Sequence, residues 1–123
     1  MASLPLSNSR QSYDVMRDMK WSQTEKTVAR AAFDSALRHE LDEITAEAKQ
    51  RAAKAKEPSD LWELEAYLTE SRKYIDNKYD YRYSILHEVL GILVQEGRLT
   101  EMDFQGLSQD KLSMIRHFAQ SKL

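Results

Sequence analysis

The chain has 123 residues, a formal net charge of −2 and no cysteine, which excludes disulfides, thiolate catalysis and zinc sites built on cysteine. Charged residues make up 31% of the sequence, with the two signs nearly balanced, so the chain as a whole does not attract nucleic acid or an anionic membrane. Only three glycines and two prolines interrupt a sequence rich in helix-forming residues, and this composition predicts an all-α fold.

The first segment, residues 1–20, is polar, contains Pro5 and shows little periodicity, which predicts a flexible N-terminal arm. It lacks the basic start and apolar centre of a secretion signal, and no stretch of the chain approaches the roughly 20 apolar residues that span a bilayer. We therefore expect a cytoplasmic protein without membrane insertion, whose single all-helical domain occupies residues 21–123.

A long helix is predicted next, from Ser22 to about Lys56, because this stretch contains no glycine or proline and opens with the capping pattern Ser22-x-x-Glu25. Such a helix is roughly 50 Å long, whereas a compact domain of this size has a diameter of roughly 35 Å. An apolar stripe in steps of three and four residues runs along it and begins with Phe33, Leu37, Leu41 and Ile44. We expect this stripe to form the stem of a homodimer; the alternative is a shorter helix folded against the C-terminal half of the same chain.

The remaining helices follow from local start and stop signals. Pro58 ends the first helix, and Asp60 with Glu63 predicts the start of a second one that runs to about residue 79. The two long helices form the predicted stem, about residues 21–79. The head, about residues 80–123, is predicted to hold three shorter helices, at residues 83–96 before a capping Gly97, at 100–107 and at 108–120.

Trp62 is the first candidate binding residue. The apolar stripe of the second helix passes through Leu61, and at 100° per residue Trp62 lies on the order of 100° away from it. A large aromatic side chain outside the core, near the charged and polar side chains of Glu65, Thr69 and Arg72, is typical of an interface anchor. The alternative is a tryptophan that covers the first helix of the same subunit.

A second candidate is the segment 74–83, which places four tyrosines and several charges around a helix junction. Tyrosine combines a large contact area with a polar tip, as binding surfaces often do. On this reading Lys78, Tyr79, Asp80 and Arg82 extend the binding surface; a structural hinge whose charges cap two helix ends explains the segment nearly as well.

No pattern in the sequence predicts an enzyme, a cofactor or a metal site. The three histidines His39, His87 and His117 form no close ligand pair, and no glycine-rich phosphate loop or nucleophile motif is present. A basic cluster of Lys49, Arg51, Lys54 and Lys56 closes the first long helix, where cations complement the helix dipole. We therefore expect no nucleic-acid binding.

Taken together, short matching segments in one order resemble the fluorescence recovery protein family of cyanobacteria. The matches cover roughly residues 21–117, and the strongest is the block 75–80. They are Trp21-Ser22-Gln23, Phe33, Glu40-Leu41-Asp42, Asp60-Leu61-Trp62, Leu64, Leu68, Arg72, Ile75-Asp76-Asn77-Lys78-Tyr79-Asp80, Arg82, Ser84, Leu93, Gln95-Glu96-Gly97 and Asp110-Lys111.

The resemblance implies a non-enzymatic, all-helical homodimer. Members of the family bind the C-terminal domain of photoactivated orange carotenoid protein, speed its return from the red to the orange form, and so end photoprotective quenching of the phycobilisome. Trp62 and Arg72 match family positions on the functional and dimer surface.

The sequence departs from the family pattern at four positions. Cyanobacterial members typically carry a His-Asp pair where this chain has Glu65 and Ala66, and Glu88 and Met114 replace a family aromatic residue and a family lysine. The alternative function is therefore a dimeric helical adaptor of the same family that binds a different protein.

Overall fold

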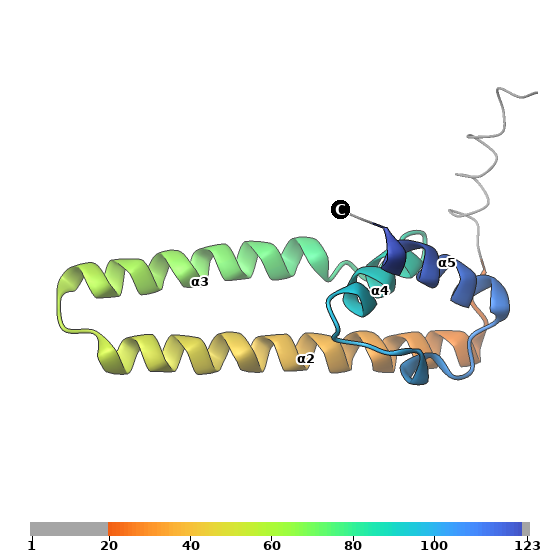
Figure 1. Ribbon diagram of the computed structural model, residues 1–123, viewed down its shortest axis with the longest axis horizontal. Helices are drawn as coiled ribbons and strands as arrows, with labels where there is room; N and C mark the ends of the chain where they lie inside the picture. The colour runs from red at the N-terminus through yellow and green to blue at the C-terminus, as the bar shows by residue number, and fades with distance from the viewer. Residues whose placement is uncertain (1–19, 122–123) are drawn as a thin grey trace, which may run out of the picture. The chain divides into compact units, whose positions relative to one another are not determined.

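The structure, a computed structural model, describes residues 20–121 and is all-α over that range (Figure 1). The predicted arm at residues 1–20 lies, apart from Lys20, outside the described residues. The elements in chain order are α2 (Gln23–Lys54), α3 (Pro58–Lys78), α4 (Leu86–Gln95), the 3-10 helix η1 (Glu101–Phe104) and α5 (Gln109–Gln120). Among these helices, none is long and apolar enough to cross a membrane.

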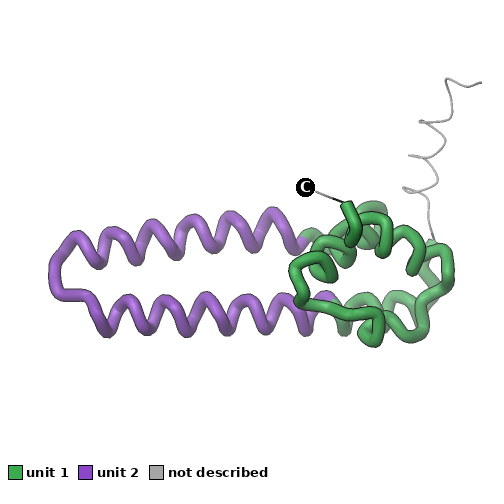
Figure 2. Tube along the Cα trace, in the orientation of Figure 1, with its two compact units in different colours: residues 1–32, 80–123 green, residues 33–79 purple. Residues whose placement is uncertain are grey.

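Contacts divide the described residues into two units (Figure 2). The first, here called the core unit, consists of residues 20–32 and 80–121; the second, the hairpin unit, consists of residues 33–79. The sequence placed residues 21–32 in the stem, whereas the structure groups them with the C-terminal helices, because Trp21, Ala29 and Ala32 are buried there.

The predicted long helix is present as α2, whose 32 residues span about 48 Å. Its capping pattern is confirmed: the Glu25 N–H donates to Ser22 Oγ at 3.1 Å, and the Ser22 N–H donates to Glu25 Oε1 at 2.9 Å. This reciprocal pair satisfies two backbone donors that the first helical turn would otherwise leave open.

Helix α3 begins two residues earlier than the sequence predicted. Pro58 occupies its first turn, where a missing N–H costs nothing. The Asp60 carboxylate accepts the backbone N–H groups of Lys56 and Glu57 at 2.8 and 3.0 Å, and these hydrogen bonds lower its pKa. Asp60 therefore caps the helix from inside its first turn and is not its first residue.

The hairpin unit holds residues 33–54 of α2 and the whole of α3, which run antiparallel to each other (Figure 2). Its buried polar centre is Glu40, whose Oε1 lies 2.7 Å from Lys78 Nζ and accepts the Tyr79 hydroxyl at 2.8 Å. Phe33 packs edge-on against the Tyr79 ring at 5.4 Å. The open end of the hairpin is thus closed by one buried polar and aromatic cluster.

In the core unit, α4 packs against α5, and Leu86, Leu90, Leu93 and Phe104 are almost fully buried. Gly97, at φ +79°, ends α4 as predicted, in a conformation that favours glycine. The predicted start of this helix at Tyr83 is wrong by three residues. The Tyr83 carbonyl accepts the indole N–H of Trp21 at 3.2 Å, and the helix begins at Leu86.

The last two predicted helices are also present. The segment predicted at 100–107 narrows to the single turn η1, and α5 follows the predicted range within one residue. Ser108 is the N-cap of α5, where its hydroxyl accepts the Lys111 N–H at 3.4 Å.

Candidate partner-binding surface

Helix α3 carries three large apolar side chains that its own chain leaves exposed. Leu61 is 50% exposed, Trp62 66% and Leu68 42%, and Leu41 on α2, in the same hairpin unit, is 42% exposed. Single exposed apolar residues are common on protein surfaces. Several of them together on one hairpin indicate a surface that another molecule covers.

Four of the predicted surface residues lie together on one face of α3. At 100° per residue, Arg72, Glu65, Thr69 and Trp62 fall at about 20°, 40°, 80° and 100° from Leu61. Thr69 is half-buried and the other three are exposed. The alternative that Trp62 covers the first helix of its own chain does not hold, because two thirds of this residue is accessible to water. We call this arc of α3, from Leu61 to Trp62, the α3 face.

The structure places the other four predicted surface residues elsewhere. Lys78 and Tyr79 direct their polar groups to Glu40 inside the hairpin unit, and the Lys78 side chain is only 6% exposed. Both are therefore structural residues. Asp80 and Arg82 belong to the core unit, where they pair with each other at 2.7 Å.

Two tyrosines of the junction, Tyr81 and Tyr83, have structural roles within the core unit. The Tyr81 ring lies under the Arg30 guanidinium at 4.4 Å and meets the Tyr83 ring at 5.5 Å. Tyr83 in turn lies 6.0 Å from the Trp21 ring. The hinge reading of the segment 74–83 thus accounts for Tyr81 and Tyr83, and Tyr74 remains 52% exposed on α3.

The four residues predicted for the dimer stem differ in how much of each side chain is accessible to solvent. Phe33 is 3% exposed and covered by its own chain, so it has little area to offer a partner. Leu37 and Ile44 are half-buried, and Ile44 lines a groove of about 410 Å³ with Tyr67 and Tyr74. Of the four, Leu41 leaves the most surface accessible.

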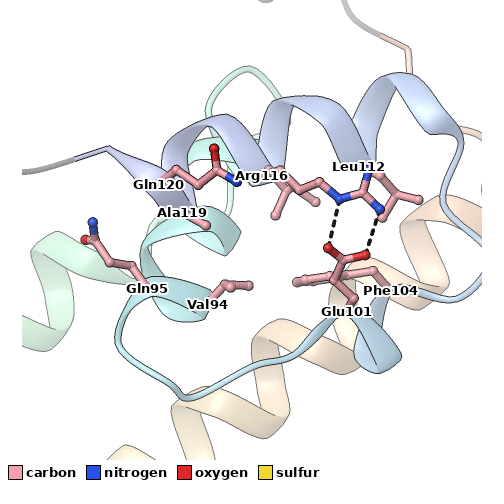
Figure 3. Close-up of a pocket in the computed structure, with 9 residues that line it drawn as sticks. Val94, Gln95, Glu101, Phe104, Leu112, Arg116, Ala119 and Gln120 are labelled. Atoms are coloured by element: carbon pink, nitrogen blue, oxygen red, sulfur yellow. Dashed lines mark hydrogen bonds and ion pairs between the residues drawn. The ribbon is translucent and has the colours of Figure 1, made fainter.

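The core unit contains a separate cavity of about 390 Å³, bounded by α4, η1 and α5 (Figure 3). Its apolar lining includes Val94, Phe104 and Ile115. At its rim the Arg116 guanidinium donates two hydrogen bonds to the Glu101 carboxylate, at 2.7 and 2.8 Å, and these bonds lower the pKa of Glu101 (Figure 3). No pattern in the sequence had indicated this cavity.

Residues 20–121 contain no group of three or more histidine, cysteine, aspartate or glutamate side chains placed to hold a metal ion. The basic end of α2 is used locally: the Arg51 guanidinium pairs with Glu47 at 2.7 Å and lies 4.3 Å from the Tyr67 ring centre. The arrangement with the best-defined chemistry for recognition is therefore the α3 face, with an indole, a guanidinium and a carboxylate together on one exposed surface.

The description of the matching family is "photoprotection regulator fluorescence recovery protein", and its sequence model covers residues 21–119. The chain belongs to this family. The fluorescence recovery protein of Synechocystis is 36% identical over 99 residues, which make up 80% of this chain and 91% of that protein.

Two solved fluorescence recovery proteins have similar folds. The structure from Fremyella diplosiphon has a TM-score of 0.78 at 36% identity, and that from Synechocystis has a TM-score of 0.78 at 35% identity. In both comparisons 83% of this chain matches the whole of the solved chain. The all-helical fold expected from the sequence is thereby confirmed.

Within the fluorescence recovery protein family, the departures of this chain lie on different parts of the structure. Glu65 and Ala66 are both exposed on α3, Glu65 on the α3 face and Ala66 beyond its Trp62 edge. Glu88 on α4 and Met114 on α5 are half-buried in the core unit. The family is described as a photoprotection regulator. The four departures change side chains that the helices present and leave the overall helical pattern as it is.

Proposed function

We propose that this chain is a non-enzymatic, cytoplasmic regulator that accelerates the return of photoactivated orange carotenoid protein from its red to its orange form. It would thereby end photoprotective quenching of the phycobilisome. The observation that carries the proposal is the exposed indole of Trp62 on α3, in a chain that belongs to the fluorescence recovery protein family.

The proposed mechanism is binding, not bond chemistry. The partner must pass through a high-energy geometry as its two domains close again. A protein that binds this geometry more tightly than the open form lowers the free-energy barrier to domain reclosure. Trp62 and Thr69 lie at one edge of the α3 face, and an exposed tryptophan provides the large apolar contact that typically dominates such an interface. The proposed partner contact is the C-terminal domain of orange carotenoid protein.

A homodimer is the second part of the proposal. Leu41, Leu61 and Leu68 together leave a substantial apolar area of the hairpin unit in water. Burying apolar area releases about 25 cal/mol per Å², so a second copy that covers these side chains gains stability. Leu61 and Leu68 lie at the edge of the α3 face away from Trp62, which leaves the tryptophan accessible to the carotenoid protein.

The test is the dark decay of photoactivated orange carotenoid protein, followed by absorbance with and without this protein. Wild type should speed red-to-orange recovery, and Trp62→Ala should lower the effective affinity about tenfold or more, because it removes a central aromatic contact. The matched control is Met102→Ala, since Met102 is also highly exposed, at 77%, but belongs to η1. Equal acceleration by wild type and Trp62→Ala would refute the role of Trp62.

A second candidate function is that of a dimeric adaptor for a different protein. It is favoured by the exposure of Glu65 and Ala66, because a surface that has lost the family His-Asp pair presents altered chemistry to a partner. A folded dimer that fails to accelerate recovery of several carotenoid-protein variants would establish this alternative over the first.

A further inference from the structure

The cavity between α4, η1 and α5 has an apolar wall large enough to receive several side chains (Figure 3). Val94 lines it from α4, Phe104 from η1, and Leu112, Ile115 and Ala119 from α5. Its volume of about 390 Å³ is more than twice the roughly 150 Å³ of an apolar cavity that holds one benzene molecule. An apolar segment of protein is therefore a suitable occupant in size and in chemistry.

The rim of this cavity presents both signs of charge. The side chains of Arg116 and Glu101 are 44% and 58% exposed, although they pair with each other. Within residues 20–121 this pair uses two of the five N–H groups of the guanidinium, which leaves three for another acceptor. The hydrogen bonds from Arg116 lower the pKa of Glu101, so its carboxylate is charged at neutral pH. A segment that carries an acidic and a basic residue complements this rim.

The N-terminal arm joins the core unit close to one end of the cavity. The Lys20 carbonyl accepts the ammonium of Lys111 at 2.7 Å, and the next residue of the chain, Trp21, is 6% exposed. Lys111 directly precedes Leu112, where the cavity lining on α5 begins. From there to Gln120 the lining extends about 12 Å along α5.

The last part of the arm, residues 13–19, has the composition that the cavity requires. Tyr13, Val15, Met16 and Met19 are its apolar residues, interspersed with Asp14, Arg17 and Asp18. Methionine is unbranched and adapts to irregular apolar cavities. Seven residues reach up to about 23 Å, which exceeds the length of the lining. The matching family model begins at residue 21, so the family match assigns no role to this segment.

We propose that residues 13–19 dock in the cavity of their own chain, with Met19 at the Leu112 end and Tyr13 toward Gln120. The apolar side chains cover the wall, and Arg17 and Asp18 join Glu101 and Arg116 at the rim. Because the arm is attached beside the cavity, docking is intramolecular, with an effective concentration of roughly millimolar order. The sequence predicts a flexible arm over residues 1–20, and docking gives its last third a fixed position.

Paired cysteines in the full chain test where the arm lies, because the chain has no cysteine of its own. Ser12→Cys adjoins the docked segment, and Ala119→Cys lies in the cavity wall. This pair should form an intramolecular disulfide under mild oxidation, measured as a change in mobility of the unreduced monomer. The matched control is Ser12→Cys/His117→Cys, since His117 is exposed and lies about 160° around α5 from Ala119.

Docking predicts that the disulfide to residue 119 forms at least about fivefold faster than that to residue 117, because it raises the local concentration at one site only. A freely moving arm would favour residue 117, since His117 is exposed and Ala119 half-buried. Equal rates at the two sites, or a faster reaction at residue 117, would overturn the proposal. The cavity belongs to the core unit and the α3 face to the hairpin unit, so neither result bears on the proposed partner contact.

Trypsin provides an independent measurement, because Arg17 lies inside the docked segment and Arg10 outside it. Val94→Phe fills the cavity and should raise the rate of cleavage after Arg17 at least about tenfold, since cleavage no longer requires the arm to open. Cleavage after Arg10 should not change. Met102→Phe, which adds the same ring at an exposed residue of η1, should leave both rates at their wild-type values. Ala119→Phe is the second cavity-filling variant, and circular dichroism checks that each variant is folded. Unchanged cleavage after Arg17 in a folded cavity-filling variant would refute docking.

Discussion

Glu25 is a buried carboxylate on which three parts of the core unit converge. It is 6% exposed and accepts the backbone N–H groups of Ser22 and Ser108, each at 2.9 Å, and the Lys111 ammonium at 3.2 Å. Burial raises its pKa, but the hydrogen bonds from Ser22, Ser108 and Lys111 outweigh burial and lower the pKa to about 2. The charged form of Glu25 is therefore part of the folded state.

This arrangement predicts acid sensitivity in a defined range. Because the pKa of Glu25 is below its ordinary value of 4.5 in the folded protein, its contribution of about 3 kcal/mol is present above pH 4.5 and lost as the pH falls toward 2. The free energy of unfolding in urea, measured at pH 7 and pH 3, should fall less for Glu25→Gln than for wild type. Glu63→Gln, a control at an exposed site, should show the same loss of stability as wild type. If Glu25→Gln also lost as much stability as wild type between pH 7 and pH 3, Glu25 would not be the group responsible.

His87 provides a second titration, at higher pH. Its residue is 1% exposed, its ring lies 5.4 Å from the Phe118 ring, and neither ring nitrogen has a hydrogen-bond partner among the described residues. Burial lowers the pKa of His87. At a pH below 6.5, its ordinary pKa, this histidine binds a proton in the unfolded chain but not in the folded chain. The free energy of unfolding therefore falls as the pH decreases through 6.5.

The expected result is a melting temperature that drops between pH 7.5 and pH 5.5 in wild type and stays nearly constant in His87→Phe, which keeps an apolar ring of similar size. The matched control is His117→Gln, since His117 is exposed and its ring also lies 5.4 Å from the Phe118 ring. If His117→Gln removed the pH dependence and His87→Phe retained it, His87 would not be the titrating group.

At the scale of helices, the contact between α4 and α5 depends on a glycine. A Cβ atom added to Gly91 would lie 2.6 Å from the Phe118 Cβ and 2.8 Å from the Ile115 carbonyl oxygen. Neither atom is the end of a flexible side chain, so the two helices must separate to admit even one methyl group.

Gly91→Ala should therefore destabilise the core unit by about 1–3 kcal/mol, despite the higher helix propensity of alanine. Gly97→Ala is the comparison, because a Cβ there has nothing within 4 Å and costs only the positive φ of +79°, about 1 kcal/mol. Urea unfolding measures both. A Gly91→Ala protein as stable as wild type would show that α4 and α5 are farther apart than described.

Much of the helix pattern was predictable because its signals are local. The capping pair Ser22 and Glu25, the stop at Pro58 and the glycine cap at Gly97 each act within a few residues, and the structure contains all three. The start of α4 was missed because the competing hydrogen bond comes from Trp21, 62 residues away in the sequence. Helix ends set by local chemistry can be read from the sequence; those set by tertiary contacts cannot.

The candidate surface divides in the same way. The helical period placed Trp62, Glu65 and Arg72 on one exposed face of α3, and the structure has them there. It could not show that Lys78 and Tyr79 turn inward, because their partner Glu40 lies 38 and 39 residues earlier in the chain. Nothing in the local sequence marked Glu40 as a buried acceptor.

For the whole molecule, the proposed homodimer predicts the effect of a charge on α2. Leu41 is 42% exposed in the single chain, so Leu41→Glu should leave the monomer folded but place a charge in the proposed interface, where an unpaired charge is costly. Light-scattering chromatography should show a shift toward the monomer mass at unchanged helix content by circular dichroism. The control is Met102→Glu, which places the same charge at an exposed apolar residue on η1 and should leave the mass unchanged. A dimer of wild-type strength in Leu41→Glu would exclude Leu41 from the contact.

The chain contains two tryptophans, Trp21 in the core unit at 6% exposure and Trp62 in the hairpin unit at 66%. An indole shielded from water emits at shorter wavelength than a hydrated one, so the two residues contribute separable bands to the intrinsic fluorescence. In Trp62→Phe only Trp21 emits, and its emission reports unfolding of the core unit. In Trp21→Phe only Trp62 emits, and its emission reports the binding of another molecule to the α3 face. The protein thus contains its own pair of optical labels, one for folding and one for association.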